Sequence, residues 1–415
     1  MMSPHRSLIS GMRLRALSLA LAFAVALVPA TQAAQAQTFS VLYDFKGPQS
    51  GGSPVAGLVL DAAGTVYGTT VFGGHRTHFQ YDGLVFKVDS QGHETVLHRF
   101  GGPDGIGPYA GVVRDAAGNL YGTTTSGGKP SKACPAGCGT VFKLNKARKE
   151  TVLHSFNGVG DGGYPYSDLI RDSDGNLYGT TYCGGKTEVC PQGHGTVFKL
   201  DKKGRFAVLY SFAGGKDGSQ PTAGLYRDAA GNLYGTTTNG GDASQSGTVF
   251  MLDTTGKETV LYRFSNGADG GIPWAGVIQD AAGNLYGTTT TGGVGACDGR
   301  TCGVVFKLDP KGNEIVLHAF TGNPDGADPR AALIQDAAGN LFGTTHGGGI
   351  NGGTVFKIDA NGIESVLRAL GDRDGAFPWG HLVQDSVGNL YGTTTDGGMG
   401  SCGGGGCGTV FKITP

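Results

Sequence analysis

Residues 119–124 read Asn-Leu-Tyr-Gly-Thr-Thr, and close copies of this hexapeptide recur roughly every fifty residues along the chain. Repetition at such a period is typical of solenoids and propellers, in which every repeat forms one structural unit. The repeat unit therefore decides the fold. Its Tyr-Gly-Thr-Thr portion begins at Tyr67, Tyr121, Tyr178, Tyr234, Tyr286, Phe342 and Tyr391.

Three further segments accompany each hexapeptide. An apolar run ending in Asp precedes it, as in residues 110–115, and Thr-Val-Phe-Lys-Leu follows it, as in residues 140–144. The last segment resembles residues 94–100, Glu-Thr-Val-Leu-His-Arg-Phe. Each segment is short, rich in β-branched and aromatic residues, and bounded by Gly, Asp or Asn, which predicts a strand. Four strands make one propeller blade, so we expect an all-β, seven-bladed β-propeller with four antiparallel strands per blade.

The ends of the chain predict how the ring closes. Residues 38–45 match the fourth strand of a unit but precede the first complete set, whereas residues 408–414 form a third strand with no fourth strand after it. We expect the N-terminal strand to complete the last blade, because this pairing removes two exposed sheet edges. An open solenoid would need no such exchange and would more typically carry capping units.

The connections predict two different faces. Strands one and two are joined by a tight Asp-Ala-Ala-Gly-Asn turn or a relative, as at residues 115–119, and strands three and four by a similar short turn. The longer connections, between strands two and three and between one unit and the next, must then lie on the opposite face. We call this the variable face, and it is the expected binding face.

The first 36 residues have the layout of a secretory signal peptide. Three arginines fall within the first fifteen residues, an apolar run covers 17–28, and Ala-Gln-Ala at 34–36 provides a cleavage site. The apolar run is shorter than the roughly 20 residues that a bilayer requires. We expect residues 37–415 to form a single propeller domain, exported to the periplasm or the cell exterior.

Charge limits the possible partners. The formal net charge of −1 becomes more negative when the arginines of the leader are removed, which argues against nucleic acid, since phosphate binding needs a basic face. No later segment is apolar for long enough to span a membrane, so we expect no membrane span. We also expect a monomer.

The eight cysteines occur as four close pairs, all in the connection between strands two and three. Such pairs in an exported chain predict local disulfides in an oxidising compartment. A zinc site is a poorer interpretation, because two thiolates per loop do not supply four ligands. We therefore expect no metal and no cofactor. The predicted pairs are Cys134 with Cys138, Cys183 with Cys190, Cys297 with Cys302, and Cys402 with Cys407.

The motifs Asn-Leu-Tyr-Gly-Thr-Thr, Gly-Gly and Gly-Thr-Val-Phe-Lys-Leu-Asp resemble the GloVer tandem repeat family, the Gloeobacter and Verrucomicrobia repeat. The resemblance covers essentially the whole chain after the leader. It implies a bacterial, exported protein, and it supplies no known reaction and no catalytic residue.

The segment that enters strand one has the form Asp-Gly-x-x-Pro in six units. Six equivalent carboxylates could line a cation site near the axis, but Asp-Gly is also ordinary turn chemistry. The turn interpretation is preferred, because a residue shared by nearly all blades generally serves the blade. The six are Asp104, Asp161, Asp217, Asp269, Asp325 and Asp374.

A ligand site on a repeated scaffold should appear where the copies differ, and the position directly after this proline does differ. If strand one is innermost, these side chains gather at the mouth of the central channel. Aromatic rings with one Arg suit stacking on a sugar or another flat polar ligand, while the alternative is that they plug the channel. The position holds Val55, Tyr109, Tyr166, Thr222, Trp274, Arg330 and Trp379, of which Tyr109, Tyr166, Trp274, Arg330 and Trp379 are the candidate ligand-binding residues.

Three functions remain open. The first is a non-enzymatic exported module that binds a carbohydrate or a protein on the variable face. The second is a metal-dependent propeller enzyme of lactonase or lyase type, which rests on fold analogy. The third is a purely structural repeat protein. A metal enzyme would place non-identical Glu, Asn, Asp or His at the channel mouth, and the aromatic residues and single Arg found at the post-proline position favour the first. No catalytic residue is predicted.

Overall fold

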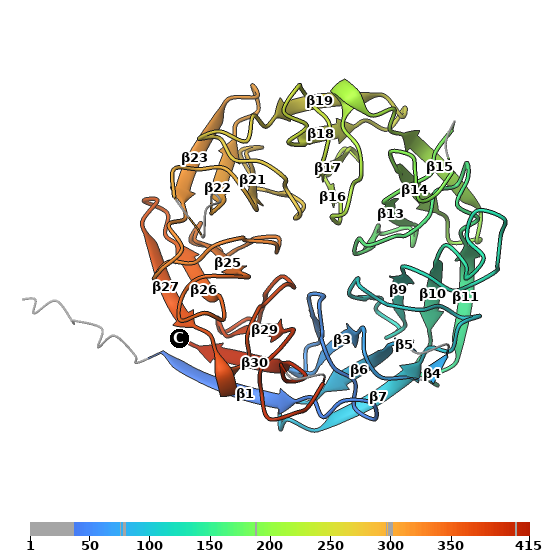
Figure 1. Cartoon of the computed structure of the whole chain (residues 1–415), viewed down its shortest axis with the longest axis horizontal. Helices are drawn as coiled ribbons and strands as arrows, with labels where there is room; N and C mark the ends of the chain where they lie inside the picture. Colours follow the sequence, from blue (N-terminus) through green and yellow to red (C-terminus); the bar gives the residue numbers. More distant parts are fainter. Residues whose placement is uncertain are drawn as a thin grey trace, which may run out of the picture. The chain divides into compact units, whose positions relative to one another are not determined.

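A computed structural model describes residues 37–74, 76–77, 80–186, 189–295, 297, 302–402 and 405–415. Residues 37–415 form one compact unit. Seven four-stranded antiparallel sheets form a ring, so the predicted propeller is confirmed (Figure 1). The predicted leader lies outside the described residues and stays a prediction. In the described part, no helix is long and apolar enough to span a membrane.

Six blades run outward from the axis in chain order, as the blade β16-β17-β18-β19 shows (Figure 1), and the seventh has the order β28-β29-β30-β1. The innermost strands are only two residues long, shorter than the apolar runs suggested: β2 (Val59–Leu60), β8 (Val113–Arg114), β12 (Ile170–Arg171), β16 (Tyr226–Arg227), β20 (Ile278–Gln279), β24 (Ile334–Gln335) and β28 (Val383–Gln384). The second strands contain the Tyr-Gly-Thr-Thr motif: β3 (Val66–Thr70), β9 (Leu120–Thr124), β13 (Leu177–Thr181), β17 (Leu233–Thr237), β21 (Leu285–Thr289), β25 (Leu341–Thr345) and β29 (Leu390–Thr394).

The two outer strands of each blade pair through a register shift next to the Phe of Thr-Val-Phe, as between Val141 and Phe142. The third strands are β6 (Leu84–Val88), β10 (Thr140–Leu144), β14 (Thr196–Leu200), β18 (Thr248–Leu252), β22 (Val304–Leu308), β26 (Thr354–Ile358) and β30 (Thr409–Thr414). The outermost are β7 (Glu94–Arg99), β11 (Glu150–Ser155), β15 (Phe206–Ser211), β19 (Glu258–Arg263), β23 (Glu314–Ala319), β27 (Glu364–Ala369) and β1 (Thr38–Asp44). Short additions not expected from the sequence are β4 (Arg76–Thr77), β5 (Gln80–Tyr81) and the 3-10 turns η1 (Gly215–Asp217) and η2 (Asp372–Asp374).

The ring closes as predicted. Strand β1 pairs antiparallel with β30, with Thr38 opposite Thr414, and completes the last blade (Figure 1). The first and the last strand of the propeller therefore share one sheet. Each covers an edge of the other that would be exposed without this pairing.

The repeated motifs hold neighbouring blades together. The ring of Phe142 covers Gly122, where an added Cβ would lie 2.7 Å from the ring, so a side chain at Gly122 would displace Phe142. Phe142 also packs edge-on, 5.1 Å between ring centroids, against Phe100 of the preceding blade. Both rings are fully buried. Thr69 adds a polar link, since its hydroxyl donates to the carbonyl of Ala110 in the next blade, 2.8 Å away. The core therefore lies between the blades.

The Asp-Gly carboxylates lie at the rim of the ring. Asp104 Oδ2 is 2.7 Å from His98 Nε2 at the end of outermost strand β7, and Asp217 Oδ2 accepts from Tyr210 at the end of β15, 3.0 Å away. Asp374 is held by Arg368 in the same way. The alternative of a cation site near the axis is therefore wrong, and the turn interpretation holds because these carboxylates tie the outer strand to the loop that follows it.

Five glutamates open outermost strands, and we call them the junction glutamates: Glu94, Glu150, Glu258, Glu314 and Glu364. Each is half-buried, and its Oε1 is buried without a hydrogen-bond partner among the described residues. Burial raises the pKa of each to about 7. In four of them the charge of an Asp-Gly carboxylate adds to the rise, as Asp104 does for Glu150. The third blade has Phe206 instead, which stacks on His154 with centroids 3.8 Å apart.

All four predicted disulfides are present, with Cα–Cα distances of 5.0 to 5.4 Å. Each closes a loop on the variable face. Cys134, Cys138, Cys183 and Cys190 are buried in one apolar cluster, so two of the cross-links also pack in the core.

Candidate functional site

The backbone turns in the same unusual way in every blade before it enters the innermost strand. The residue preceding the proline has a positive φ in all seven copies: Ser53, Gly107, Tyr164, Gln220, Ile272, Asp328 and Phe377, with φ between 51° and 64°. Only one of them is glycine. A left-handed conformation is costly for other residues, above all for a β-branched one such as Ile272, and persists only where the surroundings impose it. The turn delivers the residue after the proline to the channel.

All seven post-proline residues line one pocket of about 360 Å³ on the axis. The structure thus brings together all the candidate ligand-binding residues that the sequence predicted, at the level where the innermost strands begin. This level faces the loops between blades, so the pocket opens on the variable face. The residues are Val55, Tyr109, Tyr166, Thr222, Trp274, Arg330 and Trp379.

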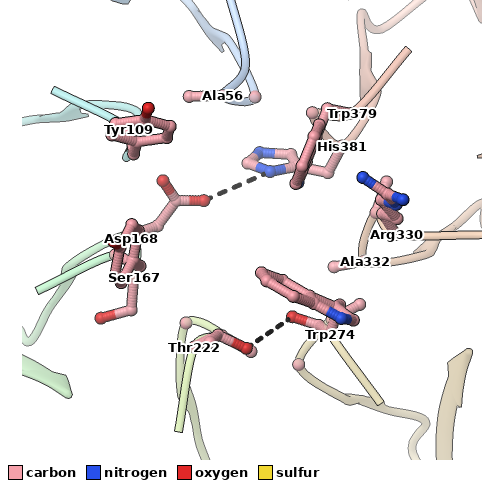
Figure 2. A pocket seen from close by; sticks show the side chains of 18 of the residues that line it. Ala56, Tyr109, Ser167, Asp168, Thr222, Trp274, Arg330, Ala332, Trp379 and His381 are labelled. Carbon is pink, nitrogen blue, oxygen red and sulfur yellow. Dashed lines mark hydrogen bonds and ion pairs between the residues drawn. The ribbon is translucent and has the colours of Figure 1, made fainter. Parts of the chain in front are cut away.

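Aromatic rings form two opposite walls of this pocket (Figure 2). On one side Tyr166 packs edge-on against Tyr109, with centroids 5.5 Å apart, and against Tyr182, 5.6 Å apart. On the other side Trp274 and Trp379 meet edge-on at 6.0 Å. Tyr182 belongs to the loop after β13 and was not among the predicted residues. Such rings expose π faces that can stack on the apolar face of a sugar.

Arg330 is fixed within the Trp wall. Its guanidinium lies 4.3 Å from the ring centroid of Trp379, and its Nε and Nη2 donate to Asp328 Oδ2 at 2.9 and 2.5 Å. His346 lies behind, with Nδ1 3.7 Å from the same carboxylate. Burial, followed by the positive charge of Arg330, lowers the pKa of His346 to about 4 despite Asp328. Near neutral pH the group therefore consists of one cation, one anion and a neutral imidazole.

Asp168 and His381 meet in the middle of the pocket (Figure 2). They come from the third and seventh blades, and His381 Nδ1 lies 3.4 Å from Asp168 Oδ2. Asp168 Oδ1 also accepts from the backbone N–H of Gly111, 2.5 Å away. An added Cβ on Gly57 would lie 2.1 Å from the His381 ring. In the ring, the first and second blades lie between the two blades that supply the pair. These two blades have Gly57 and Gly111 at the equivalent position, which leaves room for the side chains of Asp168 and His381.

Each member of this pair stabilises the charged form of the other. Burial alone would raise the pKa of Asp168 and lower that of His381, but their mutual interaction outweighs it, so the pKa of Asp168 is lowered and that of His381 is raised. The side chains are 32% and 30% exposed, so a ligand in the pocket can reach them. His381 Nε2 has no hydrogen-bond partner within the described part of the chain.

The sequence-based prediction missed this pair, and it contained the signal. The position three residues after the proline holds only Gly or Ala in five blades, but Asp168 and His381 in two. The expectation that the channel mouth holds aromatic residues and one Arg without an acid or a histidine is therefore wrong. The prediction compared the copies at the post-proline position and did not compare them two residues farther on. That Asp168 and His381 form a pair follows only from the closed ring, which brings them together.

The pocket can bind a flat polar ligand between its walls and form hydrogen bonds with it at its base. Among the described residues, no group of three or more His, Cys, Asp or Glu side chains is arranged to hold a metal ion.

The fold is widespread among solved structures of low sequence identity. The extracellular domain of a one-component system from B. thetaiotaomicron superposes with a TM-score of 0.54 at 11% identity, covering 91% of this chain and 40% of that one. A gluconolactonase from Xanthomonas campestris gives 0.43 at 17% identity, covering 75% and 87%. A PQQ-bound aldose sugar dehydrogenase from Streptomyces coelicolor gives 0.44 at 13%, covering 91% and 98%. At 11% identity the likeness to the extracellular domain shows the propeller fold alone.

No curated protein matches this chain in sequence. The repeat itself does match a known family: the model of the Gloeobacter/Verrucomicrobia repeat aligns with residues 30–244, 77–299 and 188–411, three overlapping stretches that include nearly all of the propeller. The chain belongs to the Gloeobacter/Verrucomicrobia repeat family.

Proposed function

We propose that this propeller is an exported binding module whose channel-mouth pocket binds a carbohydrate. One observation carries the proposal. The residues directly after the proline, which differ in side-chain type among the seven copies, converge on a single pocket, and that pocket has aromatic walls on opposite sides. Its volume of about 360 Å³ lies within the roughly 300–1,000 Å³ range of small-ligand sites.

The polar groups favour a ligand rich in hydroxyls and without net charge. Arg330 is neutralised by Asp328, and Asp168 is paired with His381. A charged ligand would have to displace one of these partners, whereas a hydroxyl can donate to a carboxylate and accept from an imidazolium or a guanidinium without breaking either pair.

The four disulfides support export, since such bonds persist in oxidising compartments. We propose that the leader directs the propeller to the periplasm or the cell exterior and that the mature module acts as a monomer.

A glycan array probed with residues 37–415 tests the proposal. We expect specific binding of a neutral glycan that quenches tryptophan fluorescence, because both tryptophans line the pocket. The double variant Trp274→Ala/Trp379→Ala should lose binding and keep its β-sheet circular dichroism. Phe72→Ala removes an exposed aromatic ring of the variable face outside this pocket and should bind normally. An array without hits, or equal loss in both variants, would reject the pocket as a glycan site.

A second candidate, an acid–base enzyme, is favoured by the Asp168–His381 pair alone. A carboxylate that orients an imidazole through Nδ1 leaves Nε2 to exchange a proton with a ligand. Incubating the bound glycan with the protein and following products by mass spectrometry tests this. A product formed by the parent protein and absent with His381→Ala would support catalysis, and an unchanged glycan would leave binding as the function.

A further inference from the structure

A second cavity adjoins the channel-mouth pocket. It measures about 880 Å³ and lies between the fifth and sixth blades, whose sheets begin at β20 and β24. It shares Trp274 and Arg330 with the channel-mouth pocket. All of its remaining lining residues belong to connections of the variable face. The two cavities therefore adjoin at these two side chains, one on the axis and the other farther out, and we call the outer cavity the blade 5–6 groove.

The groove is lined mainly by hydroxyl, amide and backbone groups. Two asparagines, Asn323 and Asn351, contribute side chains with no hydrogen bond to another described residue, so their amides are open to a ligand. The hydroxyls of Thr290 and Thr291 donate to Ile272 O and Asn266 Oδ1 within the fold, yet their oxygens can still accept. Three glycines, Gly322, Gly347 and Gly348, expose backbone. This lining suits a polar chain with many hydroxyls.

Two features fix described residues at the edge of the groove. The Cys297–Cys302 disulfide closes the loop of the fifth blade, and Cys297 itself lines the groove. The shared wall is also fixed, because Trp274 packs on Trp379 and Arg330 is fixed by Asp328. A wall that is fixed before binding costs a ligand less ordering entropy.

The inner end of the channel-mouth pocket is obstructed. Beneath the aromatic walls, Asp168 and His381 bridge the channel. The segments that enter the innermost strands also approach each other closely, so that an added Cβ on Gly276 would lie 2.3 Å from the carbonyl oxygen of Gly224. A polymer threaded through this level would have to displace the pair. One terminal unit fits above it.

We propose that the ligand is an oligosaccharide bound by its end, with the terminal sugar in the channel-mouth pocket and the following units in the blade 5–6 groove. This rests on the proposed carbohydrate-binding function and adds the length of the ligand and its direction across the variable face. Trp274 and Arg330 then contact the linkage between the terminal sugar and the next.

The test uses cello-, manno- and xylo-oligosaccharides of one to six units, with affinities from isothermal titration calorimetry. In the series that binds, we expect the affinity to rise at least tenfold from one unit to about four and then to level off. The groove variant Asn323→Ala/Asn351→Ala should weaken the hexamer at least fivefold and leave the single sugar unchanged. Asn157→Ala is the control on the variable face between the second and third blades: its Oδ1 accepts only from the backbone N–H of Val159, and the variant should change neither affinity.

The outcomes separate the two proposals. Binding that is independent of length, or a groove variant that weakens single sugar and hexamer equally, would overturn the end-bound chain and leave the carbohydrate pocket intact. No binding by any member of the three series would overturn both.

Discussion

The junction glutamates predict that this propeller is more stable in mild acid than above neutral pH. Each has a folded-state pKa of about 7, against an ordinary value of 4.5. Between these values the folded chain holds protons that the unfolded chain has released. The free energy of unfolding therefore falls as the pH rises from 4.5 to 7.

The size of the effect follows from the pKa difference and from exposure. For a fully shielded carboxyl this difference corresponds to roughly 3.4 kcal/mol. Because these side chains are only half-buried, solvent screening reduces it to about 0.6–1 kcal/mol per site. Five independent sites then give about 3–5 kcal/mol in all, if they add.

Other groups titrate in different windows or in the opposite direction. The turn carboxylates such as Asp115, whose pKa is lowered by hydrogen bonds that outweigh burial, lose their contribution only below about pH 4. His346, with its pKa of about 4, makes stability rise between pH 4 and 6.5, but it is one group against five. The raised pKa of His381 adds stability below 6.5 that is lost as the pH passes through its folded value.

The perturbation is the replacement of all five junction glutamates by Gln, which removes the charge and keeps the shape. Thermal unfolding followed by circular dichroism at pH 5 and pH 8 is the assay. The parent protein should melt at a higher temperature at pH 5, and the variant should gain about 3–5 kcal/mol at pH 8 relative to the parent while matching it at pH 5. Asp174→Asn, which removes an exposed carboxylate, is the control. A parent protein that is more stable at pH 8, or a variant that keeps the full pH dependence, would refute the reasoning.

Three further predictions concern the site and the ring. Gly57→Ala should displace His381, since the added Cβ would lie 2.1 Å from its ring, and NMR titration should then show a lower pKa for His381. Gly160→Ala, with open space around it, is the control and should leave this pKa unchanged. An unaltered titration of His381 in Gly57→Ala would contradict the geometry. Cys183→Ser/Cys190→Ser should lower the free energy of unfolding by about 2 kcal/mol in the chain-entropy model, measured by urea denaturation, and an undiminished stability would mean that this loop is ordered without its cross-link. Removing residues 37–44 should expose the edge of β30 and cause self-association visible by light scattering, whereas a monodisperse, fully folded product would show that closure by β1 is dispensable.

Much of the fold could be predicted because the signal is repeated. A single Thr-Val-Phe-Lys-Leu segment is ambiguous, but seven copies with the same partners determine a four-stranded blade, and the unmatched strands at 38–45 and 408–414 indicate how the ring closes. The short innermost strands were not predicted. Apolar character marked residues such as Ala110 as strand, whereas the ladder between β8 and β9 involves only Val113 and Arg114, since the chain before them serves the channel.

Part of the candidate site was also accessible from the sequence. The residues after the proline stood out because they vary between copies and include both tryptophans of the chain. The left-handed backbone at Ile272 or Phe377 carried no such signal, since neither residue favours a positive φ and the conformation is imposed by the packing of the blades.

The sequence by itself determined the blade, the number of blades, the disulfide pairs and the ring of residues that could face a ligand, because each of these depends on local pattern repeated along the chain. Only the tertiary structure decided that Asp168 and His381, from blades separated by two others, meet across the axis, and that Trp274 and Arg330 form a wall between two cavities. Those contacts depend on the closing of the ring, which brings together residues whose separation in sequence contains no information about their distance in space.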